Sequence, residues 1–156
     1  MKVLFLDVDG VLNSADTIRR YAMGIDPLLA LLVKRVIVTT GSEIVLSSSW
    51  RLIDRGRELV DQQVGKFVDV TPDLRGLRGD EIKAWLTMHP EVEKYAILDD
   101  DDDMLPEQLP NFFQTSRSTG ITEKIAIAIE NHLGSRVRYP VDLESTDGRG
   151  YLSPRS

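Results

Sequence analysis

Short apolar runs alternate with stretches of helical periodicity along this chain, and this order constrains its fold more than any other feature. Buried strands are predicted at 3–8, 44–46 and 95–98, with less distinct strands at 67–70 and 112–115. Helices are predicted at 27–40, 50–64, 80–89 and 122–133, two of them capped by Asp26 and Asp80. Strands that alternate with helices favour a parallel sheet covered on both faces. The predicted class is therefore α/β, a three-layer Rossmann-like fold with a central, mainly parallel sheet.

Length and composition set the expected domain organisation. The 156 residues suit one domain, which we expect at 1–139, followed by a polar tail at 140–156. No apolar stretch approaches the ~20 residues of a membrane span, so no membrane partner is expected. The lack of cysteine excludes disulfides and fits a reducing compartment, which favours a cytoplasmic location. We infer no obligate protein partner.

Each of the three clearest strands ends in polar residues. These are Asp7, Asp9 and Gly10 after the first strand, Ser47 after the second, and Asp99 and Asp100 after the third. Ligands of a parallel sheet collect outside the carboxyl ends of its strands, so these residues are expected to converge. Asp7 and Asp9 should share one strand face, where they repel unless a cation lies between them or one is protonated. The residues themselves indicate a divalent metal and acid chemistry.

Charge does not decide the kind of substrate. A net charge of −6 would disfavour nucleic acid as a partner. However, seven negative charges come from Asp7, Asp9 and the run of aspartates at 99–103, which is more than the net charge of the chain. If these acids hold a metal, the rest of the surface is close to neutral.

Four segments in order along the chain resemble the motifs of the haloacid dehalogenase (HAD) superfamily of phosphohydrolases. Asp-Val-Asp-Gly-Val at 7–11 is similar to the first motif, and Ser47 to the second. A basic residue before the last motif is similar to the third, and Asp99-Asp100 to the fourth. The segments at 46–51 and 78–86, with the acid run, resemble more closely a small branch found in bacterial and phage RNA-repair proteins. Little room is left for an inserted cap domain.

The resemblance implies a phosphomonoester hydrolase that works through an aspartyl-phosphate. Asp7 would be the nucleophile, Asp9 the general acid and base, and Ser47 a hydrogen-bond donor to the phosphate. Arg78 and Lys83 compete for the catalytic cation. Arg78 is favoured because it precedes the expected helix start, whereas Lys83 lies about 7.5 Å further along the helix.

The resemblance also implies a magnesium site. The ligands of Mg²⁺ would be the Asp7 carboxylate, the backbone carbonyl of Asp9, and either Asp99 or Asp100, and both of these remain candidates. Candidate substrate-binding residues are Gly10, Asn13, Ser48 and Arg51. For Ser48 the alternative is a bond to the backbone, and for Arg51 it is a role in covering its own helix. Trp50 is expected in the core more than as a platform for a base.

An open site admits bulky substrates, so nucleotides and the terminal phosphates of polynucleotides are the expected substrate classes. Two other functions stay open. One is a phospho-acceptor signalling domain, although the middle strand of such a domain ends in an acceptor Asp and here it ends in Ser47. The other is a phosphate-binding module without turnover.

Overall fold

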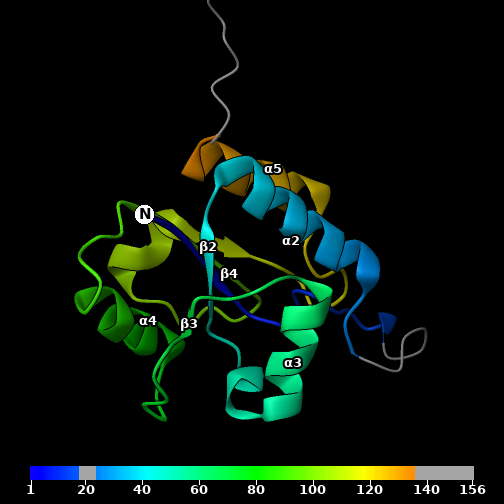
Figure 1. The fold of residues 1–156 in the computed structure, drawn as a ribbon, viewed down its shortest axis with the longest axis horizontal. Helices are drawn as coiled ribbons and strands as arrows, with labels where there is room; N and C mark the ends of the chain where they lie inside the picture. Colours follow the sequence, from blue (N-terminus) through cyan, green and yellow to red (C-terminus); the bar gives the residue numbers. More distant parts are fainter. Residues whose placement is uncertain (18–23, 136–156) are drawn as a thin grey trace, which may run out of the picture.

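Five parallel strands form the centre of the molecule (Figure 1). In the computed structural model, which describes residues 1–17 and 24–135, the sheet order is β3–β2–β1–β4–β5. The strands are β1 (Lys2–Leu6), β2 (Glu43–Leu46), β3 (Asp69–Val70), β4 (Lys94–Asp99) and β5 (Phe112–Gln114). All neighbouring pairs are parallel. The predicted α/β class is confirmed, and the tail at 140–156 lies outside the described residues.

Helices cover both faces of the sheet, so the three predicted layers are present (Figure 1). Leu4 and Leu6 of β1 face a core shared with α2 (Pro27–Thr40), α3 (Asp54–Gln63) and α5 (Glu123–Leu133). Val3 and Phe5 face a second core with α4 (Arg78–Thr87). This division follows from the alternation of side chains along a strand.

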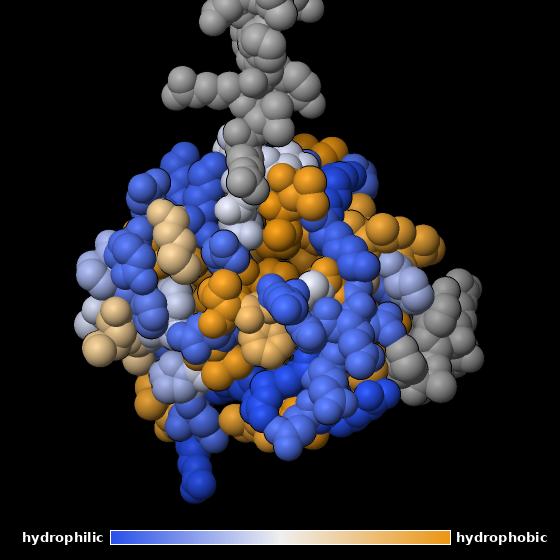
Figure 2. Space-filling model, in the orientation of Figure 1, coloured by the Kyte–Doolittle hydropathy of each residue, from blue (hydrophilic) through white to orange (hydrophobic). Residues whose placement is uncertain are grey.

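The outer surfaces of the helices are not uniformly polar. Figure 2 shows apolar side chains on the surface over α2, where Leu28, Leu31 and Val38 are exposed. No helix in the described part of the chain has the length and apolar character needed to cross a membrane.

The start of α4 differs from the prediction. The helix begins at Arg78 after Leu77, and Asp80 is its third residue and not its N-cap. The capping acceptor comes from a distant segment, because the backbone N–H of Arg78 donates to Asp103 Oδ2 at 2.9 Å. This helix start places Arg78 in the first turn of α4.

The segment after β2 also differs from the prediction. The helix expected at 50–64 is divided into a short 3₁₀ helix, η1 (Ser49–Leu52), and α3, with Ile53 extended between them. Ser48 Oγ accepts a hydrogen bond from the backbone N–H of Trp50 at 3.1 Å. The hydroxyl of Ser48 therefore caps η1, which is the alternative to a substrate contact. A second 3₁₀ helix, η2 (Pro106–Asn111), precedes β5.

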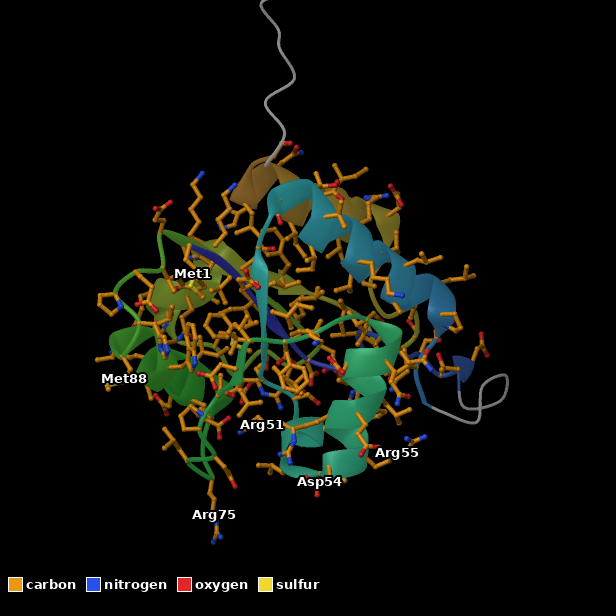
Figure 3. All side chains as sticks on the ribbon, in the orientation of Figure 1. Met1, Arg51, Asp54, Arg55, Arg75 and Met88 are labelled. Carbon is orange, nitrogen blue, oxygen red and sulfur yellow. The ribbon has the colours of Figure 1, made fainter. Side chains whose placement is uncertain are left out.

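Arg51 is buried and uses its donors within the fold, which favours the structural alternative over the predicted substrate contact. Its side chain is 4 % exposed, and Nη2 donates to Glu81 Oε2 at 2.9 Å. Its other donors bind four backbone carbonyls, those of Ser47, Ser48, Thr71 and Pro72. Arg51 thus ties the end of β2 to the loop after β3 and to α4. Arg51 is buried, whereas the side chain of Arg55 is exposed and points away from α3 (Figure 3).

This network predicts that Arg51→Ala is strongly destabilising. The substitution would leave the Glu81 carboxylate buried without its partner, so the free energy of unfolding should fall by about 3–5 kcal/mol in urea titrations. Arg55→Ala is the matched control, because Arg55 and Glu58 form an exposed pair worth about 0–1 kcal/mol. Similar losses in the two variants would contradict this account of Arg51.

Candidate active site

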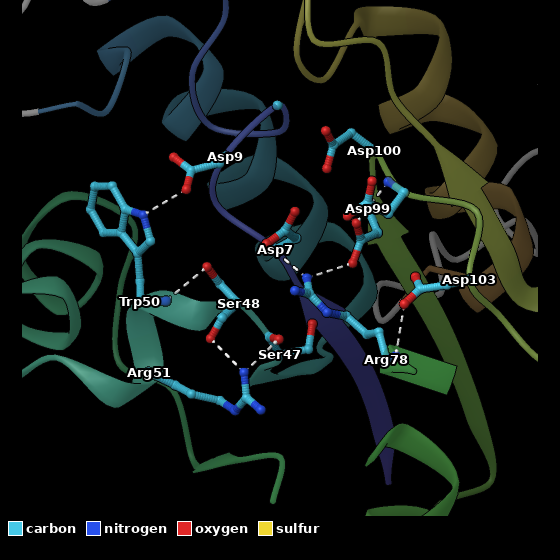
Figure 4. Close-up of polar contacts among 12 residues, drawn as sticks. Asp7, Asp9, Ser47, Ser48, Trp50, Arg51, Arg78, Asp99, Asp100 and Asp103 are labelled. Atoms are coloured by element: carbon cyan, nitrogen blue, oxygen red, sulfur yellow. Dashed lines mark hydrogen bonds and ion pairs between the residues drawn. The ribbon is translucent and has the colours of Figure 1, made fainter. Parts of the chain in front are cut away.

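The carboxyl ends of β1, β2 and β4 meet at one edge of the sheet, as the sequence predicts (Figure 4). The backbone N–H of Asp7 donates to the Leu98 carbonyl at 3.1 Å, and that of Ser47 donates to the Leu6 carbonyl at 3.0 Å. The sheet ladder therefore continues just past the strands and holds Asp7 beside both neighbours. Asp99 closes β4 on the same edge.

Asp7 and Asp9 do not share a strand face, because β1 ends at Leu6 and not at residue 8. The chain turns after Asp7, with the backbone N–H of Val11 donating to the Val8 carbonyl at 3.1 Å. Asp7 is buried at 5 % exposure, whereas Asp9 is exposed. Gly10 is required here, since its φ is +75° and an added Cβ would lie 2.5 Å from Asp100 Oδ2.

Three carboxylates form a cluster at this edge. One oxygen from each of Asp7, Asp99 and Asp100 lies within 4.8 Å of the others. Arg78 reaches this cluster from the first turn of α4, with Nη1 2.9 Å from Asp7 Oδ1 and 2.7 Å from Asp99 Oδ2. Figure 4 shows the guanidinium between the two acids. One cation therefore faces at least two buried carboxylates.

Lys83 is not part of this cluster. Its side chain is 62 % exposed, and Nζ pairs with Glu107 Oε1 at 3.2 Å. Because α4 begins at Arg78, Lys83 lies more than one turn further along the helix. Of the two candidates for the cation, the geometry supports Arg78.

The three carboxyl groups of the cluster can carry more negative charge than Arg78 offsets. Burial and the charge of Asp99 raise the pKa of Asp7 to about 8, even though Arg78 opposes this rise. Burial also raises the pKa of Asp99 to about 6. For Asp100, burial acts in the same direction, but hydrogen bonds with Arg117 and Asp7 outweigh it and lower the pKa. A cluster of hard oxygen donors whose charge Arg78 does not fully offset fits Mg²⁺.

Ser47 supplies an available hydroxyl beside these acids. Its side chain is fully buried, and Oγ has no hydrogen-bond partner within residues 1–17 and 24–135. Buried hydroxyls in proteins almost always have a partner, so the unpaired hydroxyl of Ser47 is a candidate donor to a ligand. Figure 4 shows Ser47 on the same side of the site as Arg78.

Asp9 has a different environment from the buried acids. Asn13 Nδ2 donates to its Oδ1 at 2.9 Å. Trp50 Nε1 donates to Asp9 Oδ2 at 3.1 Å (Figure 4). The Asn13 amide also accepts from the backbone N–H of Gly10 at 2.8 Å and donates to the Gly24 carbonyl at 2.8 Å. Asn13 therefore fixes the loop that carries Asp9, although it also borders the surface groove beside it.

The contact of Trp50 with Asp9 was not predicted from the sequence. Trp85 is a core residue at 4 % exposure, whereas Trp50 is partly buried against the core and uses its indole N–H in the site. The only sequence signal was its place three residues after Ser47. That position does not reveal which acid the indole reaches.

Comparison with protein families identifies the chain. The family described as the HAD domain in Swiss Army Knife RNA repair proteins matches residues 3–126. The chain belongs to this family. The match covers the three strand ends, Arg78 and the acid cluster, so the resemblance inferred from the motifs is confirmed. The HAD domain places the chain in a superfamily of hydrolases and phosphatases. Comparisons with curated proteins and with solved structures find no match.

The raised pKa of Asp7 predicts a pH-dependent effect of Asp7→Asn on stability. In the unfolded chain Asp7 ionises near its ordinary pKa of 3.8, whereas in the metal-free folded protein it keeps its proton up to about pH 8. The stabilisation that protonated Asp7 gives the folded protein is therefore complete below about pH 4. It is lost progressively as the pH rises from there through 8. In EDTA, Asp7→Asn should have a higher Tm than wild type at pH 9 and a similar Tm at pH 4.

Thermal denaturation between pH 4 and 9 measures this difference, at about 2–4 °C for each kcal/mol. Asp61→Asn is the control, because Asp61 is an exposed aspartate of α3. Adding Mg²⁺ should raise the Tm of wild type at pH 8 more than that of Asp7→Asn. A Tm difference between Asp7→Asn and wild type that does not change with pH would contradict this account.

Proposed function

We propose that this protein is a Mg²⁺-dependent phosphomonoester hydrolase that works through an aspartyl-phosphate on Asp7. The observation that carries the proposal is the placement of one buried carboxylate, Asp7, against Arg78, with a second acid, Asp9, held on the open side. Membership of a HAD family supports the reaction class. Fold and family license a reaction class, so the residue roles are argued from the site.

Asp7 is the nucleophile in this proposal. A carboxylate oxygen of Asp7 bonds to phosphorus, and the bond between phosphorus and the leaving oxygen breaks. Arg78 Nη1, at 2.9 Å from Asp7 Oδ1, orients the carboxylate and offsets the charge on the phosphoryl group during transfer. The unpaired hydroxyl of Ser47 donates a hydrogen bond to a phosphoryl oxygen.

The metal would be held by the carboxylate of Asp7, the backbone carbonyl of Asp9, and Asp99 or Asp100. When bound, Mg²⁺ supplies positive charge that keeps Asp7 ionised and shields an incoming phosphate from the surrounding carboxylates. This charge is needed because burial otherwise holds the pKa of Asp7 near 8, where the nucleophile is protonated at neutral pH.

Asp9 is the general acid and base. It donates a proton to the leaving oxygen, and then accepts one from the water that attacks phosphorus and releases Asp7. Its carboxylate is exposed, so a leaving group that Asp9 protonates can depart directly to solvent. Trp50 and Asn13 each donate one hydrogen bond to it, which fixes its orientation.

Nucleotides and the terminal phosphates of polynucleotides are the proposed substrates. The matching family is described from RNA repair proteins, which favours a nucleic-acid end. Within the described ranges, short segments and not an inserted domain connect the elements around the strand ends (Figure 1). A site without a cap admits a polymer end.

Phosphate release tests the reaction. With Mg²⁺, wild type should hydrolyse phosphorylated oligonucleotides or nucleotides, and Asp7→Asn should lower kcat by about 10³-fold or more. Asp9→Asn should lower it by about 10²–10⁴-fold for nucleotides, and by less for an aryl phosphate whose leaving group needs little protonation. Asp102→Asn, in the exposed part of the acid run, is the control.

Three results would contradict the proposal in different ways. Rapid turnover of sugar phosphates with no action on nucleotides or oligonucleotides would overturn the substrate class. Binding of Mg²⁺ and phosphate without release from any substrate would favour the phosphate-binding module. Stable phosphorylation of the chain without turnover would favour the phospho-acceptor domain.

The bond from Trp50 to Asp9 generates a separate prediction. Trp50→Phe keeps an aromatic ring but removes the N–H donor to Asp9 Oδ2. Loss of about 1 kcal/mol of orienting interaction should lower kcat for nucleotides about fivefold to tenfold. The loss for an aryl phosphate should be smaller, because its leaving group depends less on Asp9. Equal losses on both substrates would show that Trp50 acts only in packing.

A further inference from the structure

Asp9 lines a groove of about 530 Å³, and Arg117 is the single cation among the described lining residues of this groove. The remaining lining is Gly10, Asn13, Ser14 and Ala15. The groove therefore connects the proposed general acid to an arginine on the loop after β5. The phosphoryl contacts proposed for Ser47 and Arg78 do not involve this arginine.

The backbone of the Arg117 loop is fixed against the loop that carries Asp9. The Arg117 carbonyl accepts from the backbone N–H of Ala15 at 3.1 Å, and Thr115 Oγ1 donates to the Gly10 carbonyl at 2.5 Å. The backbone N–H of Gly120 donates to the Ser116 carbonyl at 2.7 Å and closes the turn. The base of the arginine is thus held in place while its side chain is 80 % exposed.

The guanidinium of Arg117 has donors left for a ligand. Its Nε donates to Asp100 Oδ2 at 2.8 Å, and Nη2 lies 3.7 Å from Asp101 Oδ1. A guanidinium carries five N–H donors, and this one stays largely in solvent. Because Asp100 belongs to the acid cluster with Asp7, Arg117 is hydrogen-bonded directly to a member of that cluster.

We propose that this groove is the leaving-group subsite and that Arg117 binds a second phosphate, adjacent to the one removed. The inference rests on the proposed function, because Asp9 must contact the leaving oxygen and so marks where the leaving group begins. The ligand chemistry is a leaving group with its own phosphate, either a phosphodiester in a nucleic-acid end or the second phosphate of a nucleoside bisphosphate. Arginine suits this role because its planar donors match phosphate oxygens.

The charges around the site explain why such a cation matters. Asp7, Asp9 and the run at 99–103 repel any substrate with an additional negative charge. Arg117 offers local attraction within the groove. The competing explanation is that Arg117 only balances Asp100 and Asp101, in which case its removal would affect every substrate equally.

The test compares two dinucleotides that carry the same terminal phosphate and differ only in the linkage. One has a phosphodiester and the other a neutral methylphosphonate, and each is made with the phosphate at the 5′ or the 3′ end. Wild type should prefer the phosphodiester in kcat/KM by about tenfold, and Arg117→Ala should lose most of this preference. The same preference in Arg117→Ala, or none in wild type, would overturn the subsite.

Arg35→Ala is the matched control for charge. Arg35 pairs with Glu123 and Glu130 where α2 meets α5, away from the groove, so its variant should keep the linkage preference. A nucleoside bisphosphate distinguishes the two sources of the second phosphate. If Arg117→Ala weakens the use of the bisphosphate as much as that of the dinucleotide, one additional phosphate is sufficient for recognition.

A binding measurement separates failure of the subsite from failure of the reaction. The dinucleotides are bound to Asp7→Asn with and without Arg117→Ala, with affinity read by competition against a labelled oligonucleotide. A linkage preference that requires Arg117 would support the subsite even if wild type released no phosphate. Binding that ignores the linkage would overturn the subsite and leave the hydrolase proposal intact.

Discussion

The repulsion among the carboxylates at the strand ends is the constraint on which the site depends. Asp7, Asp99 and Asp100 are brought together by β1 and β4, and Arg78 is the cation that faces the two most buried of them. The position of Arg78 is fixed by contacts between the start of α4 and the segment Asp103–Gln108. Asp103 caps α4, and Gln108 Nε2 donates to the Gly79 carbonyl at 2.8 Å. A side chain at Gly79 would lie 2.7 Å from the backbone nitrogen of Leu105, so α4 can approach this closely only with glycine there.

The site divides acid chemistry between two environments. Burial raises the pKa of Asp7 and Asp99 and makes both dependent on nearby positive charge. Asp9 lies outside this region, in solvent, and is oriented by Trp50 and Asn13. Pairs of acids with contrasting surroundings are a general way to assign different roles to chemically identical groups. Here the buried acids suit nucleophile and metal, and the exposed acid suits proton transfer.

Sequence patterns were sufficient for features that depend on local periodicity or strand order. The parallel sheet, the convergence of Asp7, Ser47 and Asp99, and the cap of α2 by Asp26 follow from such patterns, and Asp26 Oδ1 accepts from the backbone N–H of Leu28 at 2.9 Å. Features set by distant partners were missed. The start of α4 depends on Asp103, 25 residues beyond Arg78, and the burial of Arg51 depends on Glu81. Neither contact has a sequence signature near the residue concerned.

The central claim is that Asp7 forms a covalent bond to phosphorus, and chemical trapping of that bond tests it most directly. An acyl phosphate is reduced by borohydride to an alcohol, so a quenched reaction with substrate and Mg²⁺ should convert Asp7 to homoserine, as read by peptide mass spectrometry. The conversion should require substrate and be absent in Asp7→Asn. Steady turnover without modification of Asp7, or modification at another acid, would contradict the account.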